Sequence, residues 1–261
     1  LWSAGKAKNV RNNMVNTDAD SVFDLASLTK IFSTTLLFLQ LLSQKKITLN
    51  STLGYFFNNC PEEKRGITLN QLLTHSAGFK SWIPLYENTC DNENAIQLIL
   101  DSPMENNPGE KVNYSDLGYI LLGRVIELLS DKSMQFAFRD NIAIPLGIED
   151  DVFYLTPGKI GDTRLISATN NWKTSFNYLQ FINDQNARLF PDGCGHAGLF
   201  GNLNGLLALV RLILNDGLWY DQIIIHPEIM KRSFQIYTAK DGSSRALGWD
   251  IPGKRSQAGS G

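Results

Sequence analysis

The sequence predicts a single domain of mixed α and β structure, and three observations support this fold class. At 261 residues the chain is long enough for one large core, because folding at this length removes roughly 75% of the unfolded surface from water. Hydrophobic residues make up 43% of the chain and charged residues 19%, a balance typical of globular proteins and too apolar for a disordered chain. Apolar segments with helical periodicity alternate with short segments bounded by glycine and proline.

The composition also excludes several classes of function. Twenty-four Lys and Arg residues against 26 Asp and Glu residues give a net charge of -2, whereas binding to a nucleic-acid backbone needs a basic excess. We therefore expect no nucleic-acid partner. The glycine-rich patterns of nucleotide-binding loops and the Gly-x-Ser-x-Gly pattern of α/β-hydrolases are missing from the sequence, so no cofactor is predicted.

Cysteine and histidine spacing does not predict a metal site. The three cysteines, Cys60, Cys90 and Cys194, form neither a disulfide framework nor a Cys-x-x-Cys pair. His75 and His196 do not belong to a His-x-x-x-His pair that would hold zinc. We expect both rings to hydrogen-bond to the loop backbone near them, as buried polar rings generally must.

The element order begins with a short strand within residues 1–7 and a polar connection over residues 8–20. A helix is predicted from Ser27 to about Ser43, with apolar residues on nearly every side, which is typical of a segment enclosed by other elements. Its longest apolar run, residues 31–42, is shorter than the roughly 20 residues that span a bilayer, so no transmembrane segment is predicted.

The remaining elements are shorter, apart from one strong helix. That helix is predicted from Asp116 to Leu129, after the break at Pro108-Gly109, with Ser115 or Asp116 as its N-cap. The other expected elements are helices at residues 68–73, 94–100, 136–142 (stopped by Pro145 to Gly147) and 203–214, and a strand at 222–225. Residues 150–190 are predicted to be irregular and to form the rim of a binding site.

The tetrapeptide Ser27-Leu28-Thr29-Lys30 is the sharpest candidate for chemistry. A helical spacing of three puts the amine of Lys30 one turn from the hydroxyl of Ser27, the arrangement in which a lysine can activate a serine. The same pattern occurs at residues 3–6 and 43–46, but only Ser27 begins an apolar helix that encloses its lysine. The alternative is that Ser27 caps the helix and Lys30 reaches the surface, which the tetrapeptide alone favours.

A second segment brings Tyr114, Ser115 and Asp116 to the start of the strong helix, where a phenol can transfer a proton. With both segments in view, the sequence resembles the serine β-lactamase and penicillin-binding family. It is most similar to the branch of class C β-lactamases, D-Ala-D-Ala carboxypeptidases and related esterases. Residues 23–30 resemble the nucleophile motif of this branch and residues 114–116 its Tyr-x-Asn motif. Residues 72–78, 183–187 and 195–200 resemble three further segments.

The resemblance extends from about Phe23 to Trp249 and implies a fold. This is an α+β fold of the β-lactamase and DD-peptidase type, in which helices flank an antiparallel sheet. Residues 1–50 and 197–261 would form the α/β part of one domain covering residues 1–261, and residues 51–196 a mostly helical insertion.

The resemblance also implies a function and a set of site residues. The function is hydrolysis through an acyl-enzyme on Ser27, with peptidoglycan D-Ala-D-Ala peptides or β-lactams as substrates. Lys30 would be the proton partner of the nucleophile and Tyr114 the base or proton shuttle, while the backbone N–H of Ser27 would supply half of an oxyanion hole. The supporting or substrate-binding candidates are Ser115, Asp116, His196 and Gly198.

Two departures from the family pattern bear on activity. Asp116 stands where the branch more often has asparagine, and a carboxylate near Lys30 favours its ammonium form, which leaves the Tyr114 phenolate as proton acceptor. The Lys-Thr-Gly or His-Thr-Gly motif of the family is not found after Gly248-Trp249, so we expect a truncated domain that lacks its last strands. The segment His196-Ala197-Gly198 resembles this missing motif. Its position before the predicted helix at residues 203–214, however, matches a different segment of the family, Gly-His-Ala-Gly-Leu-Phe.

Three functions are therefore open: a cell-wall carboxypeptidase or β-lactamase, a promiscuous carboxylesterase, and a catalytically silent binding module. The expected partner is a small-molecule or peptide substrate, and the oligomeric state is not predicted. Asn113-Tyr114-Ser115 is also an N-glycosylation sequon that includes the proposed catalytic tyrosine. Passage through a glycosylating pathway would threaten this site. Export to a bacterial periplasm or cell envelope is therefore the expected setting.

Overall fold

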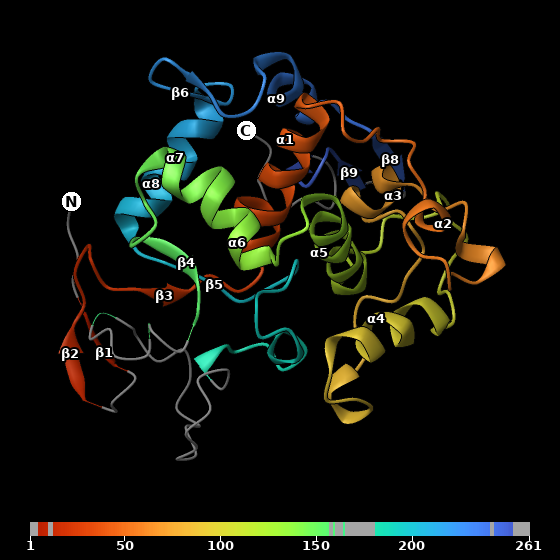
Figure 1. Cartoon of the computed structure of the whole chain (residues 1–261), viewed down its shortest axis with the longest axis horizontal. Helices are drawn as coiled ribbons and strands as arrows, with labels where there is room; N and C mark the ends of the chain where they lie inside the picture. The colour runs from red at the N-terminus through yellow and green to blue at the C-terminus, as the bar shows by residue number, and fades with distance from the viewer. Residues whose placement is uncertain are drawn as a thin grey trace.

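The computed structural model describes residues 5–9, 13–156, 159, 164, 181–240 and 243–252. Within these residues, helices surround short antiparallel sheets, which confirms the predicted α+β class. Figure 1 shows helix α1 (Leu36–Ser43) in the middle of the molecule, with α5 (Asp116–Ser130) on one side and α8 (Leu203–Leu214) on the other.

The sheet next to the candidate nucleophile has the strand order β3-β5-β4 and is antiparallel throughout. Strand β5 (Leu199–Gly201) lies between β3 (Phe23–Asp24) and β4 (Val152–Tyr154), and Phe153 stands opposite Phe200. β4 comes from the range predicted as a helical insertion and from the stretch predicted to be irregular. Its three residues are all buried, so they show no alternation by which a strand is recognised.

The helix that follows the candidate nucleophile is buried on nearly every side, as predicted. It starts with a π-helical segment, η1 (Lys30–Thr35), and continues directly as α1. The polar side chains of Ser33 and Thr34 are as completely buried as the apolar ones, so each of them needs a hydrogen-bond partner. The partner of Ser33 comes from β4 and that of Thr34 from the segment before β5, as described below.

Helix α5 begins where the sequence predicts, and its N-cap is Ser115, whose Oγ accepts a hydrogen bond from the backbone N–H of Gly118. The helix ends at Asp131, which has a left-handed backbone conformation. Two shorter helices also match their predicted positions: α3 (Leu69–Leu73), with a capping box at its start, and α4 (Asn92–Asp101).

One predicted helix is longer than expected. The sequence predicts a helix over residues 136–142 that is stopped by the segment from Pro145 to Gly147, but α6 (Met134–Phe138) continues through a π-helical segment (Arg139–Ala143) and through Pro145 into α7 (Ile144–Leu146). Pro145 is tolerated because it stands in the first turn after that segment, where its missing N–H costs little. The helix ends at Gly147, the last residue of the predicted stop, at a positive φ of 69°.

The other elements complete the frame around this centre. They are β1 (Lys6–Lys8), β2 (Met14–Asn16), α2 (Leu53–Phe56), β6 (Leu218–Trp219), β7 (Gln222–Ile223), α9 (Pro227–Ser233), β8 (Thr238–Lys240), β9 (Ser243–Arg245) and β10 (Asp250–Ile251), with 3-10 turns at Glu62–Lys64, Leu85–Glu87 and Ala187–Leu189. The predicted strands in residues 1–7 and 222–225 correspond to β1 and β7, and α8 has the predicted bounds. Among the described helices, none has both the length and the hydropathy that a membrane span requires.

A buried lysine outside the candidate site caps the C-terminal end of one of these helices. Lys64 is 1% exposed, and its ammonium group donates hydrogen bonds to the backbone carbonyls of Leu100 and Ser102 at the end of α4. Carbonyl groups at a helix C-terminus carry partial negative charge, so a cation there satisfies them. We assign this lysine a structural role.

Candidate active site

Ser27 lies in the turn between β3 and the central helix and is exposed to solvent. The residue before it, Ala26, has a φ of 45°, which is strained for a residue with a Cβ atom. The carboxylate of Asp24 holds this turn by accepting the backbone N–H groups of Ala26 and Asn183, each at 2.8 Å. Among the described residues, no acceptor is recorded for the backbone N–H of Ser27.

Lys30 is 2% exposed, and its ammonium nitrogen has three oxygen atoms around it. It donates hydrogen bonds to Ser27 Oγ at 3.1 Å and to the carbonyl oxygen of His196 at 3.0 Å, and it forms an ion pair with Asp116 Oδ1 at 2.7 Å. An ammonium group has three N–H bonds, so these neighbours match its full donor capacity.

The central helix is fastened to the segment before β5 through main-chain carbonyl groups. The carbonyl oxygens of residues 194, 195 and 196 accept hydrogen bonds from Tyr154, Thr34 and Lys30, at 3.0, 2.6 and 3.0 Å respectively. The hydroxyl of Tyr154 also contacts Ser33 Oγ at 2.9 Å. The buried polar residues of the helix are thus satisfied, and the His196 carbonyl is brought to the lysine.

Tyr114 lies beside this lysine, with the Lys30 nitrogen 5.1 Å from the centre of the phenol ring. On its other side the ring packs against His75, at a centroid distance of 4.4 Å. His75 in turn stacks on Tyr119, at 4.9 Å. The three predicted catalytic residues are therefore brought together, although the sequence showed no link between Tyr114 and His75.

His75 is a fixed neutral ring. Burial is the main reason that the pKa of His75 lies well below its ordinary value, and the nearby charges of Arg245 and Lys30 lower it further. Its Nδ1 accepts the backbone N–H of Ser115 at 3.0 Å, so the remaining proton is on Nε2. The expected hydrogen bond to the backbone is present, but it goes to the start of α5 instead of the loop near Gly78.

These groups line a cavity of about 450 Å³. Its wall includes Ser27, Lys30, Tyr114 and His75, with Leu28 and Ile31 as apolar neighbours. The opposite wall is formed by the segment between β9 and β10, where Gly248 has a φ of 82° and packs so closely on Thr35 that a Cβ atom would overlap it. The cavity is large enough for a small acyl compound or the end of a peptide.

Arg245, on β9, also lines the cavity, and the sequence analysis missed it. Its guanidinium carbon is 5.9 Å from the centre of the Tyr114 ring, and its side chain is 19% exposed. Asp250, the cross-strand neighbour on β10, is 3.6 Å from one terminal nitrogen, whereas Nε is buried with no hydrogen-bond partner. Nothing in the sequence indicated this role, because Arg245 and Tyr114 are about 130 residues apart in the chain.

The four supporting candidates have different positions. Asp116 contacts Lys30 directly, and Ser115 caps α5 while its hydroxyl donates to the carbonyl of Lys80 at 2.7 Å. His196 reaches Lys30 through its backbone carbonyl, and it is not part of the cavity wall that contains Ser27. Gly198, at a φ of 101°, turns the chain into β5 and is not part of the cavity wall.

The ring of His196 is 1% exposed and lies between two side chains. Its Nε2 is 2.9 Å from Asp184 Oδ1 and its Nδ1 is 3.1 Å from Cys194 Sγ, so the expectation of a bond to loop backbone is wrong for this ring. Burial lowers the pKa of His196, but the neighbouring Cys194 and the Asp184 carboxylate outweigh it and raise the value to about 10. For Asp184, burial raises the pKa, but contact with His196 outweighs it and lowers the value to about 2.

Asp184 is the second residue that the sequence analysis did not single out, although it falls in one of the segments that carry the resemblance. Atoms of Asp116, Asp184 and His196 lie within 4.8 Å of one another. Lys30 already supplies positive charge at this point, 2.7 Å from Asp116. We therefore interpret the group as part of the lysine environment.

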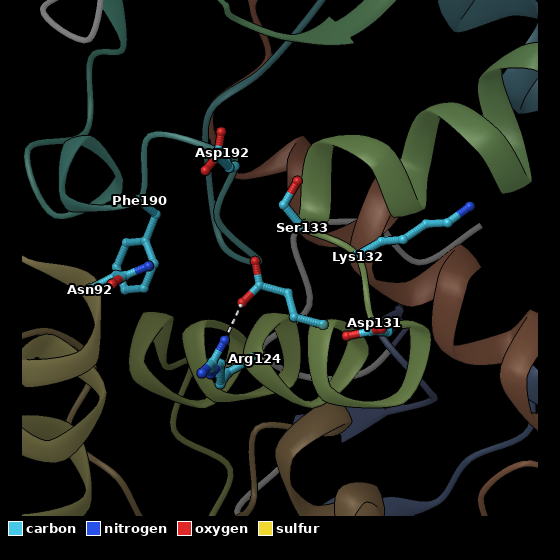
Figure 2. A pocket seen from close by; sticks show the side chains of 9 residues that line it. Asn92, Arg124, Asp131, Lys132, Ser133, Phe190 and Asp192 are labelled. Carbon is cyan, nitrogen blue, oxygen red and sulfur yellow. Dashed lines mark hydrogen bonds and ion pairs between the residues drawn. The ribbon is translucent and has the colours of Figure 1, made fainter.

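A second cavity, of about 320 Å³, lies between α5 and the segment of residues 190–193, which both contribute to its lining (Figure 2). Figure 2 shows Arg124 projecting from α5 into it, with Ser133, Phe190 and Asp192 on the facing wall. Arg124 is paired with Glu93 at 2.6 Å and with Glu127 at 3.3 Å, so its charge is balanced within the protein. Neither Ser27 nor Lys30 lines this cavity.

The Ser-x-x-Lys pattern at residues 43–46 does not form a comparable site. Ser43 donates its hydroxyl hydrogen to the carbonyl of Leu39 at 2.8 Å and accepts the backbone N–H of His226, while Lys46 is exposed. The pattern that begins at Ser3 lies outside the described residues.

Comparisons with known proteins identify the fold and the family of this chain. A D-alanyl-D-alanine carboxypeptidase of Escherichia coli (strain K12), so named provisionally, is 28% identical over 283 residues, which cover 97% of this chain and 64% of that protein. The chain thus spans a little under two thirds of the length of this relative. The penicillin-binding protein of Bacillus halodurans superposes with a TM-score of 0.72 at 17% identity, covering 97% of this chain and 82% of the other.

A third similarity is to the β-lactamase/D-alanine carboxypeptidase of Pseudomonas syringae, with a TM-score of 0.69 at 18% identity and coverage of 94% and 68% of the two chains. These similarities confirm the fold that the sequence resemblance implies. The model of the Beta-lactamase family matches residues 3–260, nearly the whole sequence. The chain therefore belongs to the beta-lactamase family.

Proposed function

We propose that this protein is a serine hydrolase that forms an acyl-enzyme on Ser27. The observation that carries the proposal is the 3.1 Å contact between the buried Lys30 ammonium and Ser27 Oγ at the wall of a cavity. A serine used only as a helix cap would not need a buried lysine, because burying an ammonium group has a large desolvation cost. A lysine that packs for structural reasons alone would not need to contact an exposed hydroxyl.

We infer that Tyr114 carries the proton transfer, because the donors of Lys30 are already engaged. With its three N–H groups directed at oxygen atoms and Asp116 at 2.7 Å, the ammonium has no lone pair to accept a proton. The Tyr114 phenolate would take the proton of Ser27 as Oγ bonds to the substrate carbonyl carbon, and the Ser27 N–H would donate to the resulting oxyanion. Tyr114 then returns the proton to the leaving group as its bond to that carbon breaks, and water hydrolyses the acyl-enzyme.

We infer that the substrate bears a carboxylate close to the scissile bond, as D-Ala-D-Ala peptides and β-lactams do. Arg245 supports this substrate class, because its guanidinium lines the same cavity and its buried Nε lacks a partner. An arginine binds a carboxylate with good geometry and at low entropic cost. The same substrate class makes the bacterial cell envelope the proposed location.

A promiscuous carboxylesterase is the second candidate. Leu28 is exposed beside Ser27, and Ile31 extends the apolar side of the cavity. Such a surface favours uncharged acyl groups and does not need Arg245. A silent binding module is the third, since the Lys30–Asp116 ion pair could hold the lysine without any reaction.

Intact-mass measurement after incubation with benzylpenicillin separates these functions. We expect wild-type protein to gain the mass of the penicillin on Ser27, and Ser27→Ala to gain none. Tyr114→Phe should acylate at least about 100-fold more slowly, the range that general base catalysis contributes. p-Nitrophenyl butyrate serves as the neutral comparison, and Arg245→Gln should weaken only the reaction with penicillin.

Each outcome decides between the candidates. Adducts from the neutral ester alone would favour the esterase, and the absence of any adduct at Ser27 with either compound would favour the silent module. A Tyr114→Phe variant that acylates as fast as the wild type would refute the role of Tyr114.

A further inference from the structure

The strongest unexplained feature beneath the active site is a buried chain of three polar side chains. His196 has one ring nitrogen 2.9 Å from Asp184 Oδ1 and the other 3.1 Å from Cys194 Sγ. His196 and Cys194 are almost completely buried, and the Asp184 side chain is 26% exposed. None of the three lines the cavity of about 450 Å³ that contains Ser27, so none of them is expected to touch a substrate.

This chain matters because of where the backbone of His196 is. The His196 carbonyl oxygen accepts a hydrogen bond from the Lys30 ammonium at 3.0 Å, and it is one of the three oxygen neighbours of that group. The other two neighbours, Ser27 and Asp116, come from different elements. A change in the orientation of the peptide group after His196 would therefore move or free the lysine.

Intrinsic backbone preference does not fix that orientation, so packing and hydrogen bonds must hold it. Gly193 and Gly198 have φ values of 100° and 101°, and Gly195 lies between them, so the segment is rich in residues with wide conformational freedom. His196 is a large side chain in this stretch, and both of its ring nitrogens are held. Immobilising the ring limits rotation of the peptide group to which it is attached.

The side chains of Asp184 and His196 also lie close to the charged groups around Lys30. Asp184 and Asp116 have oxygen atoms within 4.8 Å of each other and of the His196 ring, and the positive charge of Lys30 helps to lower the pKa of Asp184. Two carboxylates, the Lys30 ammonium and the His196 ring thus lie close together near Ser27. A neutral His196 would leave the two carboxylates with a single cation between them, an unfavourable arrangement at this depth.

We propose that Asp184 and His196 form a buried ion pair that positions Lys30, by holding the His196 carbonyl against the ammonium group that contacts Ser27. Asp184 and His196 are positioning residues in this scheme, because they act only through Lys30. The inference rests on the proposed function for its kinetic consequence, but the ion pair and the immobilised lysine exist in the resting protein and are measurable there.

The kinetic test uses Asp184→Asn, which removes the charge and keeps the shape and one hydrogen-bond acceptor. With a chromogenic cephalosporin in stopped flow, we expect the acylation rate constant to fall about 10-fold to 100-fold, as for a misplaced reacting group. The dissociation constant of the non-covalent complex should stay within about 2-fold, because Asp184 is not in the cavity wall. Cys194→Ser, which keeps a polar partner for Nδ1, should acylate within about 3-fold of the wild type.

Glu127→Gln is the matched control. It also removes a largely buried carboxylate that is paired with a cation, but Glu127 lines the second cavity, of which Lys30 is not part. We expect wild-type acylation from this variant. An equal fall in both variants, a wild-type rate in Asp184→Asn, or a loss confined to affinity would overturn the inference.

The resting-state test does not depend on activity. The chain has three histidines, and nitrogen-15 spectra at pH 8 should show one of them, His196, protonated on both ring nitrogens. The Lys30 ammonium protons should exchange slowly with water in the wild type and at least about 10-fold faster in Asp184→Asn, since a released ammonium meets solvent. A neutral His196 in the wild type would overturn the ion pair, even if Asp184→Asn does not fold.

The two arms keep the proposals distinguishable. If neither cephalosporin nor ester acylates the wild type, the proposed function fails while the spectra still decide the ion pair. If the wild type acylates normally and the spectra show no doubly protonated ring, only the ion pair and its positioning role fail.

Discussion

The contact between His196 and Asp184 links the stability of the fold to pH. The pKa of His196 is raised in the folded protein, so its contribution is complete below its ordinary value of 6.5 and is lost as the pH rises through about 10. The pKa of Asp184 is lowered, so its contribution is complete above its ordinary value of 3.8 and is lost as the pH falls through about 2. The full contribution of the pair is therefore confined to a window between about pH 4 and pH 6.5.

Asp184→Asn should accordingly destabilise the protein in a pH-dependent way. We expect the free energy of unfolding to fall by about 2 kcal/mol at pH 6, as for a buried charged hydrogen bond, and by progressively less as the pH approaches 10. Urea unfolding at pH 6, 8 and 9.5 measures this difference. A deficit that stays constant from pH 6 to pH 9.5 would contradict the assignment of charge to His196.

The same residues show how far a sequence can predict this site. Ser27 and Lys30 share one helical turn, and Tyr114 was added through a resemblance between motifs, so these three could be grouped without coordinates. Arg245 and Asp184 could not, because each acquires its neighbours only when distant segments meet. The Asp184 side chain contributes a charge beneath the site, although it does not line the cavity.

At the level of elements, the site depends on how closely two backbones approach. Gly123 in α5 faces Gly195 in the segment before β5, and a Cβ atom on Gly123 would lie 2.8 Å from the backbone nitrogen of Gly195. A Cβ atom on Gly195 would overlap the carbonyl oxygen of Tyr119. Because residues 194–196 are fastened to the central helix on their other side, they have little room to move away.

Gly195→Ala is therefore expected to damage both stability and activity. Overpacking of this kind costs about 1–3 kcal/mol or more, and it should displace the carbonyl groups that Thr34 and Lys30 bind. Thermal unfolding and the acylation rate are the measurements. Gly66→Ala is the control, because a Cβ atom on Gly66 meets nothing within 4 Å, and its stability should change by less than about 0.5 kcal/mol. Equal stability of the two variants would refute the close-contact argument.

The longer helices α4, α5 and α8 were predicted to within a few residues, whereas α2, α9 and most strands were not. Helices α4, α5 and α8 have several turns of periodic apolar residues and recognisable caps, so their positions follow from local sequence. Strands β3, β4 and β5 have two or three residues each and exist because their neighbours supply hydrogen bonds. Short strands of this kind carry too few residues for a pattern of period two.

At the level of the whole molecule, one apolar core joins the parts that the sequence analysis separated. Buried residues of the central helix, of α5 in the proposed helical insertion, and of β5 belong to the same cluster, and the π-helical segment η1 contacts α5 directly. Such continuity favours a single cooperative unit.

We therefore expect one unfolding transition. In calorimetry, the measured enthalpy should equal the van't Hoff enthalpy, and far-ultraviolet dichroism and tryptophan fluorescence should change at the same denaturant concentration. Two separated transitions would show that residues 51–196 fold independently of the rest.

The burial of Lys30 and Lys64 also determines which amines can attach the molecule to a solid support. Reagents that couple surface amines would react with exposed side chains such as Lys45, Lys111 and Lys231. Lys30 and Lys64 are 2% and 1% exposed and have their N–H groups engaged with oxygen atoms, so the same reagents would leave them unmodified. A preparation immobilised in this way retains the amine that contacts Ser27, with the molecule anchored at many sites on its periphery.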